Sequence, residues 1–392
     1  MEQKLLYVDA IKKIMTENPH CSVVEALDRC VDYYYSQLVS ENDQALIDIA
    51  FKSDVTQQNV DDFLSKWDIE CAGSNKALML SYVMKARPDL KWNEYTGPRL
   101  QGVLKFFRFR NLELIAHYTK IGKALNAAGI KPMIFKGGAM KYLRPELSRT
   151  MGDIDILVRT GEEYEKAKQI VRDLGYDFVD NIHSVDLFVP GSEAGVVDIH
   201  QFLEMRVEYD VEQLKAKLFE RATLQHIFNV DTFLPCAEDL AFISLSNMVK
   251  NIRESTSVHS ILYAVLDVDW LVHSKPDFDW KIVEQNVLLS KSEPQMYTAI
   301  GFTNKIMPGL IPEWLVNDSA LKKHVINWYN RDLFNALYVF DVKMECKKLR
   351  FKNAFKSWAD FKHYFRIEGQ HWFTKRIAKS QTLMNLFLKV MR

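Results

Sequence analysis

Apolar residues recur at steps of three and four over much of the chain, which is the spacing of one face of a helix. The first 95 residues show this spacing at positions 5–14 and 23–38, and Thr56 offers a cap for a further helix that ends near Trp67. The same spacing returns over residues 99–128, 162–174, 211–222, 238–252 and 261–273. We therefore predict helical regions at both ends of the chain.

Shorter apolar or alternating stretches in the middle of the chain predict strands. Residues 131–135 form an apolar run, residues 153–158 alternate two aspartates with isoleucines, and residues 184–189 and 195–203 flank a loop of hairpin composition. With the helix over residues 162–174, these strands make a small mixed sheet that has helices on one side. The predicted fold class is α+β, with this core between N-terminal and C-terminal helical regions.

Proline and glycine mark the first domain limit, where Gly97 and Pro98 follow a polar segment. We expect an N-terminal helical region over residues 1–97 and a core over residues 98–208. A C-terminal helical domain over residues 209–340 and a basic amphipathic helical tail over residues 341–392 would follow.

The chemistry that the sequence indicates is concentrated in aspartates of the predicted strands. Side chains two residues apart on a strand share a face, so Asp153 and Asp155 project together, about 7 Å apart, and repel each other unless a cation lies between them. Asp198, on a later strand, would bring a third carboxylate to this pair, and Asp186 is its rival. Carboxylate ligands suit Mg²⁺ or Mn²⁺, which also bind substrate phosphates. The alternative is a turn at Asp153 and an edge-strand charge at Asp155.

Candidate groups for binding phosphate precede these aspartates. Gly137 and Gly138 let the backbone turn tightly and approach a ligand, and a helix beginning at Ala139 would add positive charge from its N-terminus. Lys136, beside this turn, is either a contact to a triphosphate or a solvated strand end. Arg149 is a candidate to neutralise charge on a phosphate or on leaving pyrophosphate.

A strand, a Gly-Gly turn, a strand with two aspartates and a later strand with one more form a pattern that resembles the DNA polymerase β-like nucleotidyltransferase superfamily. One branch is similar over a longer string: Lys-Gly-Gly-Ala at 136–139, Arg-Thr-Met-Gly-Asp-Ile-Asp-Ile-Leu-Val at 149–158 and Val-Asp-Ile-His at 197–200. This branch comprises largely uncharacterised bacterial nucleotidyltransferases, often associated with surface polysaccharide gene clusters. The resemblance covers about residues 100–280. One departure is Gln201, where the family often has Trp.

The resemblance implies a metal-dependent transfer of a nucleoside monophosphate from an NTP to a hydroxyl acceptor, which would be a sugar, a lipid-linked glycan or a peptide. It implies that Asp153, Asp155 and Asp198 hold Mg²⁺ or Mn²⁺ and that Asp198 orients or deprotonates the acceptor. His200, on the same strand face as Asp198, would assist or be structural. The groups implied in nucleotide binding are Lys136, Gly137, Gly138 and Arg149.

Two other functions stay open. The same site could transfer a different phosphoryl unit. The chain could also be a non-catalytic scaffold or membrane-surface binding protein with a vestigial site, in which case it would bind vesicles but no nucleotide.

The 392-residue chain has no net charge, but its charges are unevenly distributed. Residues 343–392 carry 13 Lys and Arg against 3 Asp and Glu, so a tail of net charge +10 follows a body of −10. The apolar stripe of this tail predicts a helix whose basic face meets either acidic residues of the body or anionic lipid headgroups. Nucleic acid is not expected as a partner, because the tail shows no known nucleic-acid-binding module.

The sequence has no run of about eighteen apolar residues and lacks the N-terminal apolar segment of a signal peptide. We therefore expect a cytoplasmic protein, peripheral to the inner face of the membrane if the tail binds lipid. Five scattered cysteines without CxxC spacing indicate neither a disulfide framework nor a zinc site.

Overall fold

A computed structural model describes residues 23–317, except 53, 68, 70–73, 146–150, 182, 193, 204–209 and 255–257, together with residues 14, 17, 18 and 20. Arg149 and the predicted tail over residues 341–392 lie outside the described residues. Among the helices that are described, none combines the length and the apolar character needed to cross a membrane.

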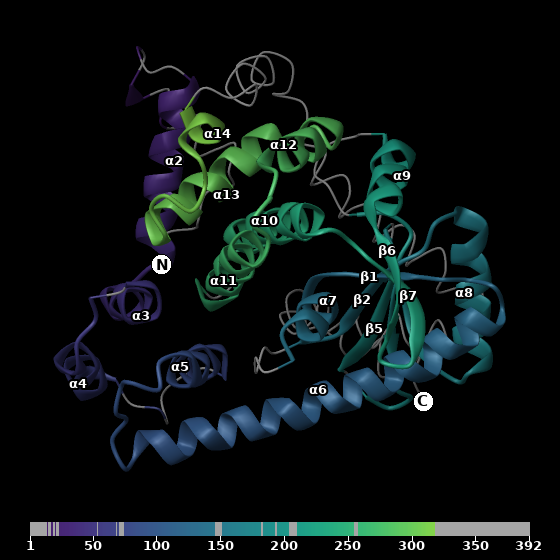
Figure 1. Cartoon of the computed structure of the whole chain (residues 1–392), viewed down its shortest axis with the longest axis horizontal. Helices are drawn as coiled ribbons and strands as arrows, with labels where there is room; N and C mark the ends of the chain where they lie inside the picture. The colour runs from purple at the N-terminus through teal and green to yellow at the C-terminus, as the bar shows by residue number, and fades with distance from the viewer. Residues whose placement is uncertain are drawn as a thin grey trace, which may run out of the picture.

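Within the described residues, seven strands form one mixed sheet in the order β3-β4-β5-β2-β1-β7-β6 (Figure 1). β2 pairs with β5, and β1 with β7, in parallel, whereas the other neighbours are antiparallel. With the surrounding helices this is the α+β class that the sequence predicts. The strands are β1 (Met133–Ile134), β2 (Ile154–Leu157), β3 (Asp177–Asp180), β4 (Ser184–Phe188), β5 (Gly195–His200), β6 (Thr223–Ile227) and β7 (Val230–Leu234).

The last two strands lie beyond residue 208, where we expected the core to end. β6 and β7 form a hairpin, and its turn residues Phe228 and Asn229 both have positive φ, 50° and 62°. Asn-Gly or Asp-Gly is the usual signal for such a two-residue turn, so phenylalanine at the first position conceals it from the sequence. Because β7 pairs with β1, we propose that the core extends to Leu234.

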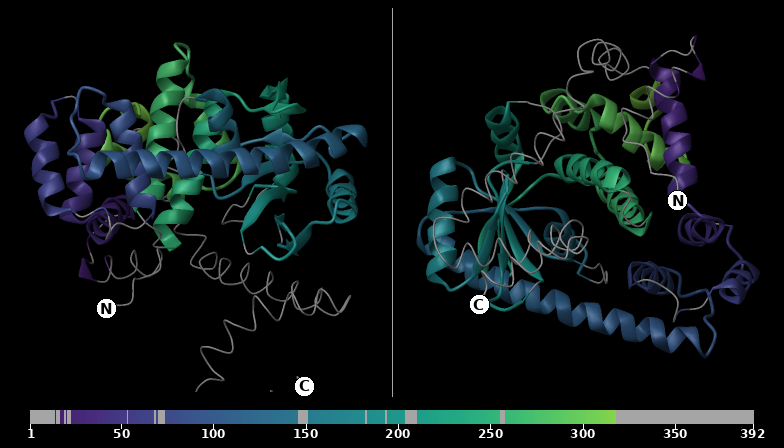
Figure 2. Two further views of the ribbon diagram at one scale, coloured as in Figure 1. Left: turned by 90° about the horizontal axis from the view of Figure 1, so that it is seen from below. Right: turned by 180° about the vertical axis from the view of Figure 1, so that it is seen from behind.

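Helices α6 (Thr96–Ala127) and α8 (Gly161–Asp173) cover one face of the sheet. On α8, Lys168 forms an ion pair with Asp180 of β3, at 3.0 Å. On α6, Gly122 allows an approach to β7 so close that a Cβ atom there would lie 2.6 Å from both methyl groups of Val230. Seen from below the view of Figure 1, α6 runs across the middle of the picture, in front of the green helices (Figure 2, left).

The remaining helices form a second layer, in which the two ends of the described chain meet. Here the Tyr297 hydroxyl of α13 donates to Asp28 of α2 (2.7 Å), and Lys305 of α13 pairs with Asp32 of α2 (2.7 Å). The two helical regions that the sequence predicts therefore contact each other. The helices before the sheet are α2 (Val23–Leu38), α3 (Glu41–Phe51), α4 (Gln57–Lys66) and α5 (Ser74–Ala86), and those after it are α10 (Ala237–Glu254), α11 (Val258–Ser274), α12 (Trp280–Leu289), α13 (Glu293–Ile306) and α14 (Glu313–Asn317).

A buried ion pair joins the sheet to this layer. Arg221, the last residue of α9 (Val211–Arg221), reaches both carboxylate oxygens of Asp239 on α10, at 2.6 and 3.0 Å. Asn286 of α12 accepts from the same guanidinium (2.8 Å) and donates to Asp239 (2.7 Å). Asp239 is fully buried, so three helices depend on one saturated polar cluster for their arrangement.

Candidate active site

Three carboxylates form a row across neighbouring strands of the sheet. Asp155 of β2 lies in register with Asp198 of β5, which in turn lies in register with Asp186 of β4. Side chains alternate between the two faces along each strand. Since Asp180 and Val230 contact α8 and α6 on one face, this alternation places the three carboxylates on the other face.

Asp155 is buried and has two partners. Its Oδ1 atom lies 2.5 Å from Nζ of Lys136 and 2.9 Å from Nε2 of His200. Burial alone would raise the pKa of Asp155, but the charge of Lys136 and the hydrogen bond from His200 outweigh it and hold the pKa well below its usual value. Asp155 is therefore a permanent negative charge.

His200 is also buried, at 4% exposure, and packs edge-on against the ring of Phe135. Burial lowers the pKa of His200, against the effect of its bond to Asp155, so the ring is neutral near pH 7. A neutral ring that bonds a carboxylate through Nε2 carries its proton there. The Nδ1 atom is then a bare acceptor, and it has no hydrogen-bond partner among the described residues.

Lys136 is the first residue of α7 (Lys136–Leu143) and has a left-handed backbone, with φ of 49°. Its side chain is 27% exposed, and its ammonium contacts the buried Asp155. Burial works against the charged form, but Asp155, Asp153 and Asp198 outweigh it, and the pKa of Lys136 is raised. This lysine therefore stays cationic beside the carboxylates.

Asp198 differs from Asp155 because it lacks such partners. Among the described residues, no hydrogen-bond donor contacts its carboxylate, whereas Asp186 beside it accepts bonds from Asn181 (2.7 Å) and Ser184 (3.0 Å). Burial, followed by the charges of Asp153, Asp186 and Asp155, raises the pKa of Asp198 to about 9. With this pKa the carboxyl keeps its proton near pH 7, and a cation bound beside Asp198 would favour the charged form instead.

Gly137 and Gly138 lie in the first turn of α7, so this helix begins earlier than the sequence predicts. The first N–H groups of a helix have no acceptor within the helix and carry its partial positive charge, which suits phosphate oxygens. A Cβ atom on Gly138 would lie 2.8 Å from Cδ1 of Ile134 and 3.1 Å from Cγ2 of Ile154. Gly138 therefore also permits α7 to pack on β1 and β2.

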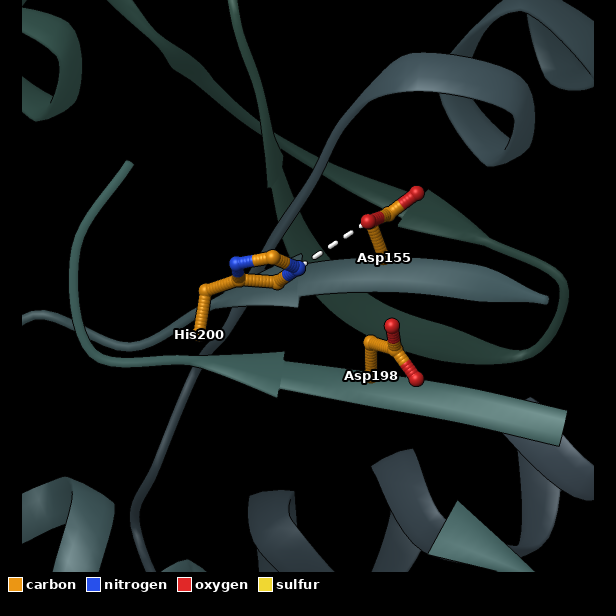
Figure 3. Close-up of side chains that lie close together, drawn as sticks. All are labelled: Asp155, Asp198 and His200. Atoms are coloured by element: carbon orange, nitrogen blue, oxygen red, sulfur yellow. Dashed lines mark hydrogen bonds and ion pairs between the residues drawn. The ribbon is translucent and has the colours of Figure 1, made fainter. Parts of the chain in front are cut away.

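The structure brings some of the predicted site residues together more closely than others. Asp155, Asp198 and His200 each offer a ligand atom within 4.8 Å of the other two (Figure 3). Asp153 lies in the bend before β2 and is not a member of this group, although its charge acts on both Lys136 and Asp198. The catalytic roles of these residues stay predictions.

The carboxylates of Asp155 and Asp198 offer oxygen ligands that fit a divalent cation, and His200 lies within 4.8 Å of both. Carboxylate oxygens suit Mg²⁺ and Mn²⁺, and imidazole suits several transition metals. Within the described residues, the carboxylate of Asp198 has no other cation or donor in contact, which supports the fit. The cluster could therefore bind a metal ion.

The family to which the chain is similar agrees with this geometry. A family described as uncharacterised nucleotidyltransferase matches residues 77–308. No curated protein matches the chain. The chain is also similar to the solution structure of the antibiotic-resistance factor ANT(2'')-Ia, at 15% sequence identity and a TM-score of 0.34, over 48% of this chain and 95% of the other.

Proposed function

The chain belongs to the uncharacterised nucleotidyltransferase family, and from this premise we propose that it transfers a nucleoside monophosphate from an NTP to a hydroxyl acceptor with the help of Mg²⁺ or Mn²⁺. The observation that carries the proposal is the register of β2 and β5. This register sets Asp155 beside Asp198, on one face of the sheet and next to the N-terminus of α7.

The triphosphate would lie at the first turn of α7. There the backbone N–H groups of Gly137 and Gly138 would bind phosphate oxygens, and Lys136 would add its positive charge. Arg149, outside the described residues, is a further candidate to neutralise the leaving pyrophosphate. These groups would orient the α-phosphate toward the carboxylates.

Asp155 and Asp198, with Asp153 at the edge of the site, would hold the divalent cation. A cation bound there supplies charge neutralisation for the phosphates and lowers the pKa of an acceptor hydroxyl. His200 would fix the orientation of Asp155 through its Nε2–H group, as second-layer hydrogen bonds do for metal-binding carboxylates.

Asp198 is our candidate for the group that receives the acceptor's proton. The acceptor oxygen would attack the α-phosphorus as a carboxylate oxygen of Asp198 takes its hydrogen. A new bond would form between the acceptor oxygen and the α-phosphorus, the bond from the α-phosphorus to the bridging oxygen would break, and pyrophosphate would leave. With the cation bound beside it Asp198 would be ionised, and no donor contacts it among the described residues, so it suits this role.

The acceptor is a sugar, a lipid-linked glycan or a peptide in this proposal, and the pathway is surface polysaccharide biosynthesis in the cytoplasm. We also keep the proposed division into an N-terminal helical region, a core, a C-terminal helical domain and a basic tail, with the core now ending at Leu234.

Transfer of label from NTP tests the reaction. The purified protein with Mg²⁺ would be given NTP labelled on either the α- or the γ-phosphate, together with a panel of sugar, lipid-linked glycan and peptide acceptors. We expect α-label on one acceptor class and γ-label in released pyrophosphate. An acceptor that receives γ-label instead would mean phosphoryl transfer and would contradict the proposal.

A further inference from the structure

One surface of α6 combines exposed apolar and basic side chains. Phe106, Phe109 and Leu112 are 65, 72 and 54% exposed, although large apolar side chains are usually covered in a folded protein. Lys105 and Arg108 lie on the same exposed side of the helix. We call these five residues the outer face of α6.

The charge of this helix is strongly positive. Between Thr96 and Ala127 the chain has six Lys and Arg residues and a single acidic residue, Glu113. Glu113 is neutralised by Arg110 of the preceding turn, at 2.7 Å. Among the described residues, neither Lys105 nor Arg108 has a carboxylate partner, so the outer face presents unbalanced positive charge.

The position of α6 makes this face accessible to an extended surface. At 1.5 Å per residue the helix is about 48 Å long. It runs along the lower edge of the molecule in Figure 1, and from below it passes in front of the green helices in the middle of the picture (Figure 2, left). The outer side of such a helix is convex, which suits a broad flat partner better than a strand that must be enclosed in a groove.

The outer face is adjacent to the end of the sheet that carries the candidate site. In the same part of α6, Arg110 donates to the carbonyl of Gly195 at the start of β5 (3.0 Å), and Asn111 accepts from the backbone N–H of Met151 (3.4 Å), shortly before β2. The helix therefore holds both strands that supply the clustered carboxylates.

We propose that the outer face of α6 is a docking surface for an anionic lipid bilayer. Phe106, Phe109 and Leu112 would enter the boundary between headgroups and acyl chains, while Lys105 and Arg108 contact headgroup phosphates. Aromatic and aliphatic residues with flanking cations are the composition of helices that lie in such an interface. The consequence for catalysis, an acceptor hydroxyl carried by a lipid, rests on the proposed function.

Charge disfavours the other occupants of this face. The segment over residues 343–392 has a net charge of +10, so it would be repelled by Lys105 and Arg108. A second copy of the chain docked through the same face would bring the same positive charge against itself. An anionic surface is the complementary partner.

Vesicle flotation without nucleotide tests the docking surface separately from catalysis. The full chain should bind vesicles rich in phosphatidylglycerol and not vesicles of phosphatidylcholine. Lys105→Ala/Arg108→Ala should weaken binding by roughly tenfold or more, because each basic residue near the surface contributes substantially. Phe106→Ser/Phe109→Ser should also weaken binding by roughly tenfold, through lost apolar burial.

Matched variants elsewhere on the surface are the controls. Leu224→Ser removes another exposed apolar side chain, 47% exposed on β6, and Lys217→Ala/Lys281→Ala removes two exposed charges from other helices. Both should bind anionic vesicles like the wild type. All variants should keep the wild-type melting temperature and NTP binding, since the replaced side chains lie at the surface and outside the candidate site.

Four results would overturn the proposal. The first is a wild type that does not bind anionic vesicles, and the second is equal vesicle binding by the wild type and both α6 variants. The third is that these variants lose RNA or DNA binding and keep vesicle binding. The fourth is a wild-type dimer that Phe106→Ser/Phe109→Ser converts to a monomer. A protein that binds vesicles but no NTP would leave the docking surface intact and contradict only the proposed function.

Discussion

Asp155 and Asp198 occupy neighbouring positions in the sheet but have different surroundings. Asp155 has Lys136 and His200 as partners, whereas among the described residues no donor contacts Asp198, and burial and three other carboxylates outweigh the charge of Lys136 there. The same row of the sheet thus holds one carboxylate that is charged and one carboxyl whose raised pKa keeps it protonated near pH 7. From this difference we propose that the pair binds a cation and that Asp198, ionised when the cation is bound, accepts the proton.

Replacing Lys136 with methionine tests whether the lysine compensates the negative charge of Asp155. Lys136→Met leaves a buried carboxylate with His200 alone, so we expect a loss of about 1–3 kcal/mol in the free energy of unfolding in EDTA. Mg²⁺ should restore part of this loss, because a ligand that binds only the folded state stabilises it. Urea unfolding with and without Mg²⁺ measures both effects.

The control for this experiment is Lys136→Met/Asp155→Asn. Removing the charge along with its partner should cost less than the sum of the two single changes. If the double variant loses the full sum, or if Mg²⁺ stabilises Lys136→Met no more than the wild type, the balance described for Asp155 is wrong.

At the scale of single elements, alanine substitutions at two glycines of α6 should change the stability of the protein in opposite directions. Gly122→Ala puts a Cβ atom 2.6 Å from both methyl groups of Val230, so neither rotamer of the valine relieves the clash. We expect destabilisation by about 1–3 kcal/mol from overpacking, and Val230→Ala should relieve it.

Gly102 is the matched position, because no atom lies within 4 Å of an added Cβ there. Gly102→Ala should stabilise the protein by about 0.5–1 kcal/mol through helix propensity. Thermal unfolding of both variants is the measurement. Destabilisation of equal size by the two alanines would contradict the packing of α6 against β7.

The start of α10 predicts a dependence of stability on pH. Glu238 is fully buried and accepts bonds from Lys275 and from the backbone N–H of Asp279. Burial opposes its charge, but these bonds outweigh it and lower the pKa of Glu238 from 4.5. A pKa lowered in the folded state gives stability that is present above the unfolded pKa and is lost as the pH falls through the folded one.

We therefore expect Glu238→Gln to be less stable than the wild type at pH 6, with a difference that shrinks as the pH falls below about 4.5. Urea unfolding across this range measures the difference. A difference that stays constant, or that grows toward low pH, would show that the charge of Glu238 does not contribute in this way.

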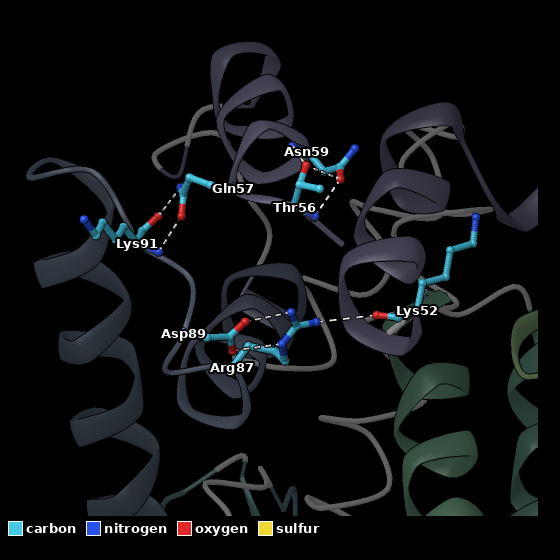
Figure 4. A network of polar contacts seen from close by, with 7 residues as sticks. All are labelled: Lys52, Thr56, Gln57, Asn59, Arg87, Asp89 and Lys91. Atoms are coloured by element: carbon cyan, nitrogen blue, oxygen red, sulfur yellow. Dashed lines mark hydrogen bonds and ion pairs between the residues drawn. The ribbon is translucent and has the colours of Figure 1, made fainter. Parts of the chain in front are cut away.

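Several elements could be predicted from the sequence because their signals are local. Thr56 caps α4 together with Asn59, whose side chain bonds back to it (Figure 4). The spacing of the carboxylates follows from the two-residue period of a strand. The same figure shows what is not local: the amide of Gln57 bonds both backbone groups of Lys91, at 2.8 Å each, and no sequence pattern indicates that pair.

At the scale of the whole molecule, the sequence signals fail where contacts join distant segments. The hydrogen bond from His200 to Asp155 depends on the register of β2 and β5. Without that register, the sequence cannot show whether His200 is only structural or contacts the carboxylates. The contact between α2 and α13 spans 269 residues of chain at Tyr297 and Asp28. Contacts between such distant residues depend on how the complete fold packs.

Substitutions in the polar cluster of Arg221, Asp239 and Asn286 test how much it contributes to joining the sheet and the helical layer. Arg221→Ala leaves Asp239 buried without its cation, and we expect a loss of about 3–5 kcal/mol in the free energy of unfolding. Lys217→Ala, on the same helix, breaks the exposed pair with Glu220 and should cost less than about 1 kcal/mol. Similar losses for both variants in urea would contradict a structural role for the cluster.

The most direct test of the account is isothermal titration of the full chain with each of the four NTPs, in Mg²⁺ and in EDTA. We predict heat for at least one NTP that requires Mg²⁺ and that is lost in Asp155→Asn and in Asp198→Asn. Asp180→Asn, which changes a carboxylate on the opposite face of the sheet, should bind like the wild type. Binding that is unchanged by EDTA and by both substitutions, or a folded wild type that binds no NTP, would contradict a metal-dependent nucleotide site at these carboxylates.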